Sequence, residues 1–102
     1  MQKLEGCDDR ALILEEGWLN VMRWGASQHR FPISEVGPSE VARNDKGKLL
    51  GLFGQKVERV RICFGEPGYT GRLATSIWLP LAREQEARDF AAAVDAAREA
   101  AA

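Results

Sequence analysis

The residues of this sequence that could carry out chemistry are few and widely separated. His29 is the single histidine, and Cys7 and Cys63 are the only cysteines. A zinc site needs about four closely spaced ligands, and a catalytic histidine needs a nucleophile or an acid within reach. The sequence also lacks the phosphate-binding loops, nucleophile elbows and paired-cysteine motifs of common enzymes. We therefore expect a protein without catalytic activity, metal or cofactor, in which His29 faces solvent in a turn.

Three arginines form the clearest charged pattern. Arg59 and Arg61 alternate with apolar residues, so both lie on one face of a predicted strand, and Arg72 is expected across the next hairpin. A basic stripe of this kind can bind a phosphate or an acidic partner. It is equally typical of a solvated strand face that pairs with glutamates on a neighbouring strand.

The three tryptophans are the strongest candidates for an interface. Trp18 and Trp24 share strand parity, opposite Leu19 and Val21, and Trp78 lies opposite the aliphatic residues of its own strand. If the aliphatic faces form the core, all three indole rings lie on the outside, where tryptophan often marks a protein interface. The alternative is that one or two rings line the core. The sequence leaves open which face of the 18–24 strand is buried.

Residues 49–54 (LLGLFG) form an apolar segment interrupted by glycine and flanked by lysines. Leu50, Leu52 and Phe53 would fill the core as part of a short strand, contact a partner, or insert into a membrane surface. All three possibilities stay open. The candidate binding residues are therefore Trp18, Trp24, Trp78, Leu50, Leu52, Phe53, Arg59 and Arg61.

Short strands separated by Gly/Pro turns are the elements that must position these residues. Residues 1–9 are expected to be a flexible end or a short lead-in strand. Pro32 places its own strand at a sheet edge or a bulge, and a turn is expected over 25–28. The expected strands cover 10–15, 18–24, 29–36, 39–43, 49–54, 56–64 and 72–79.

One Ala-rich helix over 81–100 closes the chain. Alanine is the best helix former, and an apolar stripe with a spacing of three and four predicts an amphipathic helix. The stripe contains Ala87, Phe90, Ala91, Val94 and Ala97. Phe90 and Val94 are expected to cap the core. The core residues expected beneath them are Val60, Ile62, Leu73 and Ile77.

Length and charge limit the classes of function. The 102 residues predict a single domain spanning the whole chain. Fourteen Lys and Arg residues balance fifteen Asp and Glu residues, which does not favour nucleic-acid binding and permits self-association. The sequence shows no signal-peptide pattern and no apolar run near the ~20 residues of a membrane span. We expect a cytoplasmic protein with reduced thiols.

Three stretches resemble the pleckstrin-homology-like (PH-like) superfold, as found in small bacterial domains. Residues 17–23 (GWLNVMR) and 31–36 (FPISEV) resemble its second and third strands, and 87–94 (ARDFAAAV) resembles the Phe-bearing face of its closing helix. The resemblance covers about residues 10–98. It implies a mainly β, α+β fold, in which six or seven strands form a curled antiparallel sheet or partial barrel capped by one C-terminal helix.

The same resemblance implies a binding or assembly module without catalysis, whose partner is another protein or a second copy. Phosphoinositide binding in this superfold depends on a Lys/Arg cluster between the first two strands. The corresponding loop here is taken as residues 15–17 (EEG), which is acidic. A peripheral membrane or lipid-binding domain and a small-ligand-binding barrel remain as alternatives.

Overall fold

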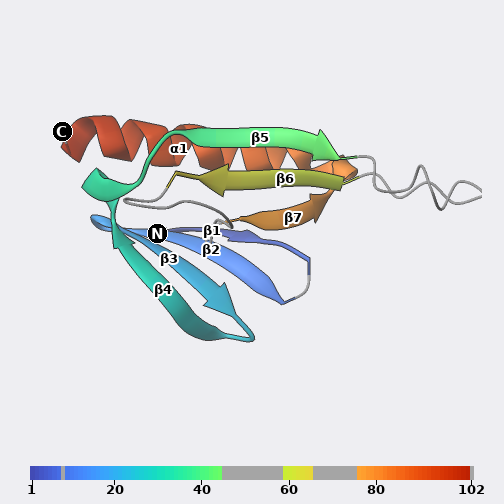
Figure 1. The fold of residues 1–102 in the computed structure, drawn as a ribbon, viewed down its shortest axis with the longest axis horizontal. Coiled ribbons are helices and arrows are strands. Elements are labelled where there is room, and N and C mark those ends of the chain that lie inside the picture. Colours follow the sequence, from blue (N-terminus) through green and yellow to red (C-terminus); the bar gives the residue numbers. More distant parts are fainter. Residues whose placement is uncertain (8, 45–58, 66–75, 102) are drawn as a thin grey trace, which may run out of the picture.

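The computed structural model describes residues 1–7, 9–44, 59–65 and 76–101, which form two antiparallel sheets and one C-terminal helix (Figure 1). The first sheet has the order β1-β2-β3-β4, and its strands are Gln2–Glu5, Arg10–Glu15, Trp18–Arg23 and Ala26–Pro32. The second has the order β5-β6-β7, and its strands are Ser39–Asn44, Arg59–Phe64 and Ile77–Pro80. The helical elements are η1 (Ile33–Glu35), η3 (Leu81–Arg83) and α1 (Glu84–Ala101).

The expected mainly β architecture with one closing helix is confirmed, but the strands do not form one continuous sheet or a closed barrel. The described strands divide between β4 and β5, where η1 and the Gly37–Pro38 step redirect the chain. The two sheets touch where the Cys7 N–H donates to the Trp78 carbonyl at 2.7 Å. A barrel would need a paired register at such junctions, and the described strands have none there.

Two of the expected boundaries in the first sheet are wrong. Arg23 pairs with Ala26, so the turn consists of Trp24 and Gly25 and β4 begins at Ala26, within the expected 25–28 turn. The strand expected over 29–36 ends at Pro32, because Ile33–Glu35 forms a 3-10 turn. Pro32 correctly predicted an edge, since β4 is the outer strand of its sheet. Residues 2–5 form the lead-in strand β1.

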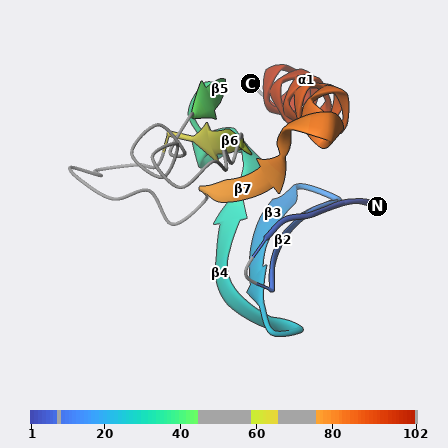
Figure 2. The same cartoon turned by 90° about the vertical axis from the view of Figure 1, so that its right-hand side faces the viewer.

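The core lies between the two sheets and is closed by α1, which covers one open side of both (Figure 2). Phe90 is 4% exposed, and its ring meets that of Phe64 edge to face, with 6.5 Å between centroids. Phe90 and Val94 therefore cap the core as predicted. Of the expected partners, Leu73 lies outside the described residues. The others are buried: Val60, Ile62 and Ile77.

Polar contacts join α1 to the edge strand β5. Arg43 donates to the Glu84 carboxylate at 2.7 Å, and Arg88 pairs with the same carboxylate at 2.8 Å. Hydrogen bonds from Arg43 and Arg88 lower the pKa of the Glu84 carboxyl. Ser39 donates to Asp95 at 2.6 Å further along the helix. The Arg43–Glu84 pair has an exposed arginine and contributes little stability, and Ser39–Asp95 is one partly buried hydrogen bond, so the apolar stripe is the main attachment of the helix.

Candidate functional site

The first sheet has an inner face that forms the core and an outer face that carries the candidate site. Leu19 and Val21 of β3 are 0% and 4% exposed, which assigns the aliphatic face of this strand to the core. Trp18 and Met22 therefore lie on the outer face. The strand register places Ile13 and Ala11 of β2 on the same side, because Ala11 pairs with Met22. The outer face is thus apolar over these four residues, and Asn20 on the same face donates to the Glu15 carboxylate at 3.2 Å.

Trp24 stands at the edge of this face, in the hairpin turn between β3 and β4. It is 68% exposed, and Trp24 and Met1 are the large apolar residues that are exposed in the described ranges. Its φ is +52° and that of Gly25 is +76°, as in a type I′ turn. The Trp24 N–H donates to the Asp9 carbonyl at 2.9 Å, and the Arg23 guanidinium lies 4.3 Å from the ring centroid. A hydrogen bond therefore fixes the backbone of Trp24, whereas most of its ring is exposed to solvent.

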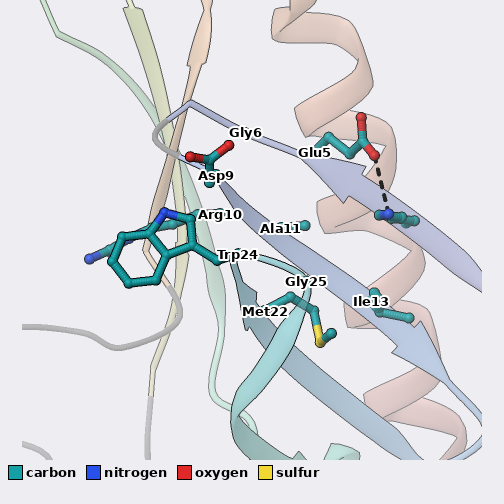
Figure 3. A pocket seen from close by; sticks show the side chains of 10 residues that line it. Glu5, Gly6, Asp9, Arg10, Ala11, Ile13, Met22, Trp24 and Gly25 are labelled. Carbon is teal, nitrogen blue, oxygen red and sulfur yellow. Dashed lines mark ion pairs between the residues drawn. The ribbon is translucent and has the colours of Figure 1, made fainter.

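A pocket of about 580 Å³ opens beside Trp24 (Figure 3). Its walls combine apolar side chains of the outer face with charged groups of both signs. Lys3 and Glu5 form an ion pair at 3.1 Å on one side, and Arg10 donates to the Ser76 carbonyl at 3.4 Å. The lining residues are Lys3, Glu5, Gly6, Asp9, Arg10, Ala11, Ile13, Met22, Trp24 and Gly25.

Trp18 lies on the same outer face as the pocket but at its far end, and Trp78 lies on the second sheet. Trp18 is half-buried at the opposite end of β3, with the Arg30 guanidinium 4.1 Å from its ring centroid. Trp78 is half-buried on β7 of the second sheet, where the Arg61 guanidinium lies 5.8 Å from its ring centroid. None of the three tryptophans is a buried core residue. They nevertheless do not form a single surface.

The arginines of β6 form a strand face on which Arg61 pairs with a glutamate of the neighbouring strand. Arg59 and Arg61 are half-buried on β6, opposite the fully buried Val60 and Ile62. Arg61 lies 3.7 Å from the carboxylate of Glu40 on the adjacent strand β5. Four residues of the sequence-based sites lie outside the described residues: Leu50, Leu52, Phe53 and Arg72.

The loops that join the first three strands carry acidic residues and no basic ones. Because β1 precedes Arg10, the first two strands are joined by residues 6–9, and the 15–17 loop joins β2 to β3. Residues 6–9 (GCDD) carry two acidic residues and no basic one. His29 is exposed as predicted, but it lies on β4 and stacks on Phe31 at 6.0 Å between centroids.

The two cysteines are free thiols in contrasting surroundings. Burial raises the pKa of the Cys63 thiol, against the opposing effect of Arg61. Because the thiolate is the reactive form, we predict that iodoacetamide alkylates Cys7, which is partly exposed, at least ~10-fold faster than Cys63 at neutral pH. Mass spectrometry of timed samples measures both rates, and a urea-unfolded sample should show them converging. Equal rates in the folded protein would contradict the burial of Cys63.

Metal binding requires a cluster of ligand side chains, and membrane crossing by a helix requires a long apolar segment. In the described part of the chain, no three His, Cys, Asp or Glu side chains come together in a way that could hold a metal ion. None of the helices there has both the length and the apolar character needed to cross a membrane. Comparisons with protein-family models, with curated proteins and with solved structures found no match.

Proposed function

We propose that this chain is a PH-like interaction module without catalytic activity, which binds another protein or a second copy through the outer face of its first sheet. Seven described strands followed by a closing helix agree with what the resemblance implies. Trp24 is the proposed anchor residue, and the pocket beside it supplies the surrounding contact surface. The exposure and backbone conformation of Trp24 carry this proposal.

Trp24 carries two energetic costs that the isolated chain does not recover. A left-handed φ costs a residue with a side chain about 1–2 kcal/mol, and Asn or Gly would normally occupy this turn position. The exposed ring also forgoes the favourable transfer of apolar surface out of water. Strained residues that persist in a structure are often found at binding sites. Burial of the indole ring in a partner would recover the second cost and offset the first.

The charges around Trp24 favour a protein partner over an anionic lipid surface. Lys3 and Arg10 on the pocket wall are matched by Glu5 and Asp9, so Arg23 beside the Trp24 ring is the one unmatched cation among these residues. A mixed rim around an aromatic anchor is typical of protein interfaces. The pocket also lies on the outside of a sheet, whereas a ligand-binding barrel holds its ligand inside.

The proposal includes a cytoplasmic location and excludes nucleic acid and cofactors as partners. Two free thiols fit a reducing compartment. The near-zero net charge gives little long-range attraction to a phosphate backbone.

A selection experiment with displayed peptides tests the proposed face without requiring that the partner be identified. A random peptide library on phage is selected against the wild-type protein and, in parallel, against Trp24→Asn. We expect enriched peptides with an aromatic or large aliphatic residue, whose affinity falls about 30-fold or more on the variant, as for a hot-spot residue. Glu99→Ala is the control, because it changes an exposed residue of α1, on the other side of the first sheet. Peptides that bind wild type and Trp24→Asn equally well would overturn the proposed site.

A further inference from the structure

We propose that the partner of the Trp24 face is a second copy of this chain, docked about a twofold axis so that each Trp24 ring enters the pocket of the other copy. This inference rests on the proposed function and names its partner. In a twofold interface the same patch occurs on both sides, so it must be complementary to itself. The outer face of the first sheet meets this requirement in shape and in charge.

The shape requirement is a projecting group and a cavity on one surface. Trp24 projects at the pocket rim, and the pocket of about 580 Å³ adjoins it on the same face (Figure 3). This volume is comparable to that of clefts that bind ligand-sized groups, and the pocket is open to solvent on one side. Figure 1 shows that α1 and the second sheet lie on the other side of the first sheet, which leaves this face uncovered by described elements. A Cβ built on Gly25 meets nothing within 4 Å, so the space beside the turn at Gly25 is open.

The charge requirement is that cations and anions both occur in the patch. The pocket wall carries Lys3 and Arg10 as cations and Glu5 and Asp9 as carboxylates. Lys3 pairs with Glu5 at 3.1 Å and Asp9 adjoins Arg10, so the two signs are interspersed, and a twofold operation that turns the patch onto itself brings cations of one copy to carboxylates of the other. Such complementarity orients association and disfavours wrong partners. The formal net charge of −1 adds little overall repulsion between copies.

Charge-reversal variants at Lys3 and Glu5 distinguish a second copy from other partners. Two opposite variants can restore each other's binding only if copies of this chain bind one another. Lys3 and Glu5 are surface residues, with side chains 49% and 69% exposed, so substitutions there should leave the fold intact. Lys3→Glu leaves the patch with an acidic excess, and Glu5→Lys leaves it with a basic excess. Each variant alone should associate at least ~10-fold more weakly than wild type, because like charges then meet across the axis. An equimolar mixture of the two should regain most of the lost affinity as a mixed dimer.

Sedimentation equilibrium of the wild type and these variants is the experiment. We expect wild-type mass to rise towards that of a dimer with concentration, and Trp24→Asn to dissociate about 30-fold more readily. Glu99→Ala, which changes an exposed residue of α1 on the other side of the first sheet, should associate like wild type, and circular dichroism confirms that every variant is folded. A wild type that stays monomeric up to about 1 mM, a Trp24→Asn that still dimerises normally, or charge variants that do not complement would each overturn the second-copy inference. If the second-copy inference fails but the selected peptides still require Trp24 for binding, the proposed function remains supported.

Discussion

Phe90→Ala should lower the free energy of unfolding by about 3–5 kcal/mol, the usual cost of deleting a buried aromatic ring. Phe90 is 4% exposed and packs edge to face on Phe64, with Ala91 and Val94 buried beside it on the same helix face. The substitution removes apolar contacts from both sheets' shared core and leaves a cavity there. Domains of this size have a total stability of roughly 5–15 kcal/mol, so the variant should approach the limit of folding.

The rest of α1 cannot compensate for this loss. In the Arg43–Glu84 and Arg83–Glu86 ion pairs one partner is largely exposed, Arg43 at 70% and Glu86 at 60%, and such pairs are worth about 1 kcal/mol or less. The neighbouring alanines of the stripe bury little apolar area individually. Phe90 is therefore the residue on which the attachment of the helix chiefly depends.

Urea denaturation followed by circular dichroism measures the effect of Phe90→Ala. The matched control is Asp89→Ala on the exposed side of the same helix turn, which should change stability by no more than about 0.5 kcal/mol. If Phe90→Ala is too unstable to purify, Phe90→Leu keeps an apolar side chain and should show a smaller loss in the same direction. A loss below about 1 kcal/mol for Phe90→Ala would mean that the helix does not cap the core.

Periodicity predicted the parts of this fold that depend on local pattern. The spacing of three and four from Ala87 to Val94 identified the buried helix face, because that spacing places side chains on one side of a helix. Alternation identified the buried face of β6, where Val60 and Ile62 are fully buried and Arg61 is not. Both patterns follow from backbone geometry and are independent of distant contacts.

The division into two sheets and the pocket depend on contacts between distant residues. The break between β4 and β5 has no periodic signal, and the sequence of 31–36 predicts one extended segment across Pro32, which the structure does not have. The pocket combines β1, the loop after it, β2, and the β3–β4 turn, which come together only through strand pairing. One local signal was available for the turn: a Gly two residues after a strand end, in the Trp24–Gly25 step, is typical of a tight hairpin.

Trp24→Asn should raise the free energy of unfolding by about 0.5–1 kcal/mol, even though it deletes a large side chain. Asn tolerates a left-handed φ, and Asn-Gly is the preferred pair for a type I′ turn, so the substitution relieves most of the ~1–2 kcal/mol cost at φ +52°. The contact that is lost is the exposed stacking of Arg23 on the indole ring, worth about 0.5–1 kcal/mol. The relief of backbone strain therefore exceeds the lost contact.

Thermal unfolding at low protein concentration measures this gain on the monomer. An increase of a few °C in Tm is expected, since 1 kcal/mol corresponds to about 4–8 °C in a domain near this size. Gly25→Ala is the opposite control: its Cβ has free space, but φ is +76°, so it should destabilise through backbone strain alone. A lower Tm for Trp24→Asn would show that the ring stabilises the monomer. A stabilised Trp24→Asn that has also lost association would mean that the indole ring is kept at this turn for binding, at the expense of the fold.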